Sequence, residues 1–81
     1  MKRVLRFTAG WCSPCKMLAL QLEDIENKPI IEVIDIEEKS DIAIEYGIRG
    51  VPTLVMLDEN IEVKRHSGMM MKTELESWLN D

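Results

Sequence analysis

The stretch Trp11-Cys12-Ser13-Pro14-Cys15-Lys16 holds both cysteines of this 81-residue chain and decides how its first half folds. Pro14 suits the first turn of a helix, because proline already has a helical φ and needs no N–H partner there. A helix that begins near Cys12 places this sulfur at the positive end of the helix dipole, which favours a thiolate and lowers the thiol pKa. The spacing therefore predicts a pair of thiols that cycles between the reduced and disulfide states.

The residues after this motif predict different surroundings for the two sulfurs. Cys15, Leu18 and Ile25 recur at helical spacing, so Cys15 is expected on the buried stripe of a helix that Pro29 ends. Cys12 lies at the mouth of the helix and is expected to be the exposed sulfur.

The elements around this helix predict a βαβ unit. Residues 3–9 mix β-branched, aromatic and apolar side chains and end at Gly10, as a strand followed by a turn does. Residues 30–36 are almost continuously aliphatic, which indicates a parallel strand covered on both faces. Ser40 is expected to cap a short helix that runs to Tyr46.

The second half of the chain predicts a hairpin and a last helix. Residues 53–57 and 61–66 are strand-like and are joined through the turn residues Asp58-Glu59-Asn60. Thr73 and Glu76 have the spacing of a helix capping box. The order β-α-β-α-β-β-α predicts one α/β domain over residues 1–81, with a mixed four-stranded sheet and helices on both faces.

The composition excludes several classes of function. A net charge of -5, from 15 acidic against 10 basic residues, argues against nucleic-acid binding. No segment is apolar enough for a signal peptide or a membrane span, and two cysteines make no disulfide framework, so we expect a reducing cytosol. A structural zinc site needs four ligands, and His66 is the only histidine, so we predict no metal and a solvated His66.

The cysteine motif, the later stretch Tyr46-Gly47-Ile48-Arg49-Gly50-Val51-Pro52-Thr53, and Gly68 together resemble the thioredoxin family. The similarity runs from about Val4 to the C-terminus. The family begins with a further strand and helix that have no counterpart here, so the resemblance implies a minimal thioredoxin fold of glutaredoxin size. It also implies that Cys12 attacks a substrate disulfide and Cys15 resolves the mixed disulfide, with no cofactor beyond this cysteine pair.

The resemblance assigns roles to further residues. It implies a cis peptide bond before Pro52, which leaves the Val51 backbone free to pair with an extended substrate. Thr53 follows in the same motif, and Trp11 and Gly68 complete an apolar rim around the attacking sulfur. Of the two residues between the cysteines, Pro14 matches the family, whereas Ser13 replaces its usual glycine, from which we expect an altered redox potential.

Other positions depart from the family pattern. Arg6 and Val33 stand where thioredoxins have a buried aspartate and a lysine that help to move the proton of the second cysteine. We expect Arg6 to reach the surface or to pair with Asp35 or Glu37, and Arg6 and Lys16 to tune the thiol pKa values. Met69-Met70-Met71 is interpreted as a core or helix-entry segment, with a flexible contact surface as the alternative.

The resemblance implies a cytosolic, monomeric protein disulfide reductase. Its expected partners are a flavin-dependent thioredoxin reductase as electron donor and protein disulfides, such as that of a ribonucleotide reductase, as acceptors. Two alternatives stay open: a glutaredoxin-type protein reduced by glutathione, and a non-catalytic binding subunit that uses the same fold.

Overall fold

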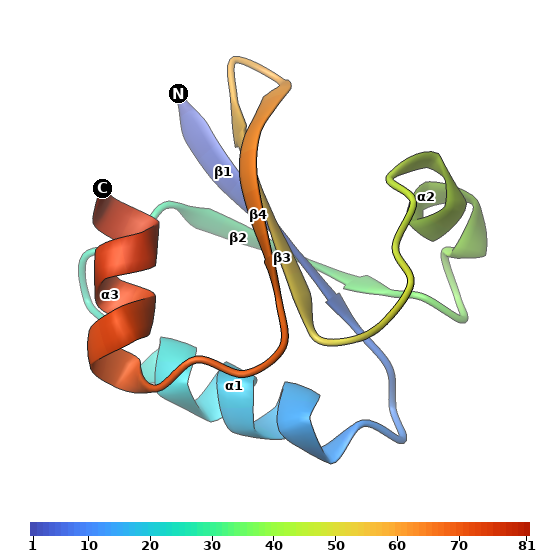
Figure 1. The fold of residues 1–81 in the computed structure, drawn as a ribbon, viewed down its shortest axis with the longest axis horizontal. Helices are drawn as coiled ribbons and strands as arrows, with labels where there is room; N and C mark the ends of the chain where they lie inside the picture. The colour runs from blue at the N-terminus through green and yellow to red at the C-terminus, as the bar shows by residue number, and fades with distance from the viewer.

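The computed structural model describes residues 1–81 and has the predicted element order around one four-stranded sheet (Figure 1). The strands lie in the order β2-β1-β3-β4; β1 pairs with β2 in parallel, and the other two pairings are antiparallel. The mixed sheet and the fold class are as predicted. The elements are β1 (Lys2–Thr8), α1 (Ser13–Glu23), β2 (Ile30–Asp35), α2 (Ser40–Glu45), β3 (Thr53–Asp58), β4 (Ile61–Ser67) and α3 (Lys72–Asn80).

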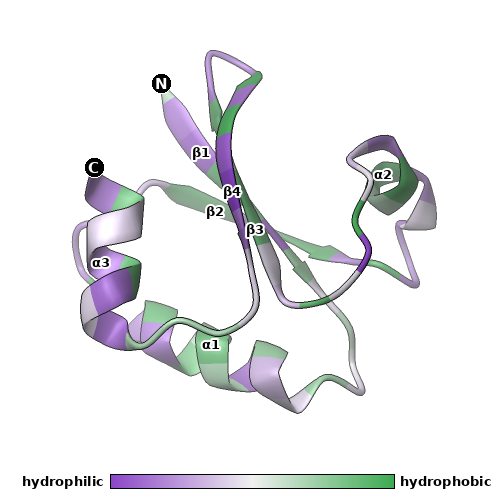
Figure 2. Ribbon diagram, in the orientation of Figure 1, coloured by the Kyte–Doolittle hydropathy of each residue, from purple (hydrophilic) through white to green (hydrophobic).

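The core consists of two apolar clusters, one on each face of the sheet. Val4 and Leu54 face α1 and α3, whereas Leu5 and Phe7 face α2. Successive strand residues point to opposite faces, so β1 and β3, in the centre of the sheet, contribute to both clusters. Figure 1 shows α1 and α3 on one side of the sheet and α2 on the other, and in Figure 2 the outer strand β4 is hydrophilic over much of its length.

The prediction that residues 30–36 are covered on both faces is wrong. The strand β2 forms an edge of the sheet, and its side chains Ile30 and Val33 are 58% and 51% exposed. Ile34 is buried against the α2 face. Aliphatic composition favours a strand, but the strand order of the sheet decides how much of that strand is covered.

The helix ends also differ from the predictions. α1 stops at Glu23 well before Pro29, and Ile25 reaches the core from the turn that follows. Ser40 lies inside α2 and does not cap it, since Lys39 is the N-cap residue and makes no side-chain capping bond. Backbone N–H groups before α2 instead find an acceptor in the Asp35 carboxylate.

The predicted capping box of the last helix is absent. The N-cap residue of α3 is Met71, which makes no side-chain capping bond, and Thr73 lies within the helix. The neighbouring Met70 is fully buried in the α1/α3 cluster, so the apolar entry segment holds this helix end in place of a polar cap. The core interpretation of the methionines is confirmed for Met70, whereas Met71 is exposed.

Candidate active site

The two cysteines form a disulfide at the start of α1. Cys12 is the N-cap residue of this helix, and its Sγ accepts a hydrogen bond of 3.2 Å from the backbone N–H of Cys15. Pro14 occupies the first turn, where its missing N–H costs nothing. In the reduced state the same N–H and the helix dipole would favour a thiolate at Cys12.

Apolar residues from three parts of the chain pack around the disulfide. Ala9, from the end of β1, is buried with both cysteines, and Ile36 and Val51 pack against them. The prediction of an exposed Cys12 is wrong, since Cys12 is 4% and Cys15 1% exposed. Ile36 and Val51, from distant parts of the chain, pack against the cluster in which Cys12 is buried.

The loop that covers the disulfide is tied to the neighbouring strands. The Val51–Pro52 peptide bond is cis, and the Pro52 carbonyl accepts a hydrogen bond of 2.8 Å from the N–H of Gly68. Thr53 is buried, and its Oγ1 donates to the Gly50 carbonyl at 2.7 Å. Neither the N–H nor the carbonyl of Val51, the residue before Pro52, has a hydrogen-bond partner in the chain.

The structure brings the other predicted site residues to the rim of this region. Trp11 is 67% exposed, which excludes the alternative that it serves as a core residue. Ser13, Pro14 and Lys16 are exposed on the first turn of α1. Gly68 has a φ of 98°, a conformation that favours glycine, and open space surrounds the position that a Cβ would occupy.

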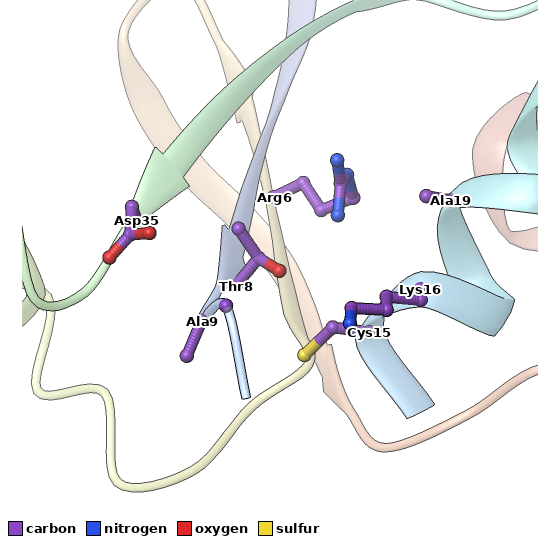
Figure 3. A pocket seen from close by; sticks show the side chains of 8 residues that line it. Arg6, Thr8, Ala9, Cys15, Lys16, Ala19 and Asp35 are labelled. Atoms are coloured by element: carbon purple, nitrogen blue, oxygen red, sulfur yellow. The ribbon is translucent and has the colours of Figure 1, made fainter. Parts of the chain in front are cut away.

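A pocket of about 220 Å³ lies beside Cys15, between β1 and α1 (Figure 3). The Arg6 side chain extends from β1 towards Ala19 on α1, and the Thr8 hydroxyl and Asp35 also line the pocket. Arg6 pairs with neither Asp35 nor Glu37, contrary to one of the two expected arrangements. It is half-buried, and this burial lowers the pKa of Arg6.

Sequence reasoning gave no role to Thr8 and Ile36 near the disulfide, and it considered Asp35 only as an ion-pair partner of Arg6. Thr8 ends β1, Asp35 ends β2 and Ile36 follows it. The carboxyl ends of neighbouring parallel strands meet at one edge of a sheet, where sites in α/β proteins commonly form. That rule, applied to the predicted βαβ unit, would have found all three.

No three His, Cys, Asp or Glu side chains come together in a way that could hold a metal ion. His66 lies on β4, beside Leu54 of β3. None of the helices has the length and apolar character needed to cross a bilayer.

Comparison with known proteins assigns this site to a family. A family-wide sequence profile described as Thioredoxin matches residues 1–81. A thioredoxin of Buchnera aphidicola subsp. Baizongia pistaciae is 40% identical over 78 residues, which cover 91% of this chain and 72% of that protein. A mitochondrial thioredoxin of Mus musculus is 34% identical over 80 residues, covering 94% of this chain and 48% of that protein.

Solved structures agree with the sequence relatives. A thioredoxin mutant from Halobacterium salinarum NRC-1 superposes with a TM-score of 0.89 at 31% identity, covering 96% of this chain and 71% of that one. Fasciola hepatica thioredoxin superposes with a TM-score of 0.86 at 27% identity, covering 96% of this chain and 77% of that one. The chain therefore belongs to the thioredoxin family, and its Cys12–Cys15 pair is the redox-active disulfide of a thiol-disulfide oxidoreductase.

Proposed function

We propose that this protein reduces disulfides in other proteins, with Cys12 as the attacking thiol and Cys15 as the resolving thiol. The single observation that carries the proposal is the hydrogen bond from the Cys15 N–H to the Cys12 sulfur at the start of α1. A thiolate at Cys12 would keep this bond and gain from the helix dipole, so Cys12 is the sulfur better prepared to act as nucleophile.

In the reaction, the Cys12 thiolate attacks one sulfur of the substrate disulfide. A mixed disulfide forms, and the other substrate sulfur leaves as a thiolate. The Cys15 thiolate then attacks the Cys12 sulfur, the bond between Cys12 and the substrate breaks, and the second substrate thiolate leaves. The dithiol has given two electrons to the substrate and has become the disulfide seen in the structure.

The Val51 loop supports a binding mode for the substrate. The free backbone groups of Val51 lie beside the disulfide, where an extended substrate segment would pair with them as a short added strand. The exposed Trp11 ring and the open space at Gly68 would border that segment. We propose Val51, Pro52 and Thr53 as the substrate-binding segment, with Trp11, Ser13, Pro14 and Gly68 shaping its rim.

We propose a flavin-dependent thioredoxin reductase as the electron donor and protein disulfides, such as that of a ribonucleotide reductase, as acceptors. A dithiol that reduces other proteins must itself be kept reduced, which favours the cytosol. We further propose that residues 1–81 act as one monomeric domain, and that the dithiol is the only redox group that the reaction needs.

The test measures reduction of a protein disulfide, with insulin as the probe, in two systems: NADPH with thioredoxin reductase, and glutathione with its reductase. We expect turnover with thioredoxin reductase. Turnover with glutathione alone would identify the glutaredoxin-type alternative instead. No turnover in either system would overturn the proposal and leave the binding-subunit alternative.

The two cysteines serve as each other's control. Cys12→Ser should abolish turnover and form no mixed disulfide with the substrate, whereas Cys15→Ser should abolish turnover but accumulate the mixed disulfide at Cys12. Mass spectrometry under non-reducing conditions distinguishes the two results. Accumulation in Cys12→Ser instead would reverse the assigned roles.

A further inference from the structure

The pocket beside Cys15 contains the guanidinium of Arg6, which forms no ion pair. Arg6 forms none of the ion pairs in the structure, and burial alone accounts for its lowered pKa, with no carboxylate acting against it. Arg3, on the same strand, shows the contrast, since its guanidinium pairs with Glu32 at 2.7 Å. The Arg6 guanidinium is therefore partly removed from water without gaining a counter-charge.

The other groups of the pocket favour an anion of small size. Lys16 adds a second positive charge and Thr8 a hydroxyl, whereas Asp35 is the one acidic side chain. One oxygen of Asp35 already accepts the N–H of Glu37 at 2.8 Å. The pocket has a volume of about 220 Å³. One water molecule takes up roughly 30 Å³ in the liquid, so the pocket has room for a small anion.

Cys15 lines the same pocket, in which Asp35 is the one carboxylate. No side chain makes a hydrogen bond to its sulfur. Before Cys15 can attack the mixed disulfide, its thiol must lose a proton, because the thiolate is the nucleophile. The Asp35 carboxylate accepts the N–H groups of Glu37 and Glu38, so an anion bound in the pocket would offer a further acceptor for that proton.

We propose that the pocket binds a small oxyanion, of the carboxylate or phosphate class, held by Arg6 and Lys16, and that this anion accepts the proton of Cys15. The guanidinium is a planar fork of N–H donors that matches two oxygens of such an anion. The proton passes from the Cys15 sulfur to an anion oxygen. The thiolate then attacks the Cys12 sulfur, and the substrate sulfur leaves with the electron pair of the broken bond. The inference rests on the proposed function, because it concerns its second step.

The test separates the two steps with one equivalent of 2,2′-dipyridyl disulfide added to the reduced protein. Attack by Cys12 releases the first thiopyridone, and attack by Cys15 releases the second. Formate, and separately inorganic phosphate, are titrated at constant ionic strength with chloride as the balancing anion. We expect the second step to accelerate by roughly tenfold and to saturate, less than the 10²–10⁴-fold typical of a positioned base. The first step should not change.

Variants connect this effect to the pocket. Arg6→Gln should lose the saturable acceleration, whereas Arg3→Gln removes the same charge from the other face of β1 and should keep it. Lys16 is exposed on the first turn of α1, so the Lys16→Gln variant should fold normally. Its second step should need higher anion concentrations to reach the maximal rate. In wild type, amide chemical shifts should move with formate around Thr8 and Cys15.

Three results would overturn the inference. The first is a second step that does not respond to either anion. The second is an acceleration that rises without saturation and is equal in Arg6→Gln, because bulk buffer would then be the base. The third is an anion-independent second step that Asp35→Asn slows strongly, because Asp35 would then be the acceptor. Failure of the proposed function is recognised separately, as absence of turnover with the two reductase systems while both thiopyridones are released.

Discussion

Leu18 and Leu20 lie on α1, the helix that carries the cysteines, and they offer a matched test of how this helix is held. Leu18 is 0% exposed, in the cluster between the sheet, α1 and α3, whereas Leu20 is 58% exposed. Replacing each by alanine removes the same atoms and leaves a residue with high helix propensity. Any difference in the free energy of unfolding therefore reports burial alone.

The magnitude follows from that difference. Leu→Ala at a fully buried position loses the transfer free energy of the side chain and leaves a cavity, at a cost of about 2.7–5.0 kcal/mol. An exposed substitution usually changes stability by less than about 0.5 kcal/mol. A chain of 81 residues unfolds at a total cost of about 4–12 kcal/mol. Leu18→Ala should therefore remove a large part of the stability, and Leu20→Ala almost none.

The assay is urea unfolding of the oxidised proteins, followed by the circular dichroism of the helices. We expect a much lower urea midpoint for Leu18→Ala. The slope of the unfolding free energy against urea concentration should not change, because unfolding exposes nearly the same surface area in both variants. Equal midpoints for the two variants would refute the reasoning. So would a loss below about 1 kcal/mol for Leu18→Ala, since it lies outside the range for buried leucines.

Three further predictions concern the hairpin, the pH dependence and the thiols. Glu59→Asn should stabilise the chain by about 1 kcal/mol, because Glu59 has a φ of 51° in the turn before β4 and asparagine tolerates that conformation better. The ion pair of Glu59 with the N-terminal amine, which the substitution removes, is exposed and contributes little; an unchanged urea midpoint would contradict the prediction. The Arg65 hydrogen bond lowers the pKa of Glu62 from its ordinary 4.5, so the pair stabilises the fold above that pH and less as the carboxylate protonates. The stability gap between wild type and Arg65→Gln should shrink in urea titrations below about pH 4.5, and a gap of equal size at pH 3 and pH 7 would exclude this role. Arg6→Ala should raise the pKa of the Cys12 thiol, because it removes a positive charge beside the disulfide; an unchanged pKa, measured from the ultraviolet absorbance of the thiolate, would contradict this.

The parts of the site that sequence predicted are those set by near neighbours in the chain. The start of α1 follows from Cys12 and Pro14, and the buried stripe follows from the spacing of Cys15 and Leu18. The hairpin turn follows from Asp58-Glu59-Asn60, of which the last two have positive φ. Each of these features depends on caps, φ preferences or periodicity within a few residues.

The parts that sequence could not predict depend on which distant segments meet. The amino acids alone determined a β-α-β-α-β-β-α chain with a cysteine pair opening a helix after a strand. Only the tertiary structure decided that β2 is an edge strand, that Cys12 is buried in a cluster against which Val51 packs, and that Arg6 lies unpaired beside Cys15. The physical reason is that conformational preferences act over a few neighbouring residues, whereas burial and charge pairing are set by packing between segments far apart in the sequence.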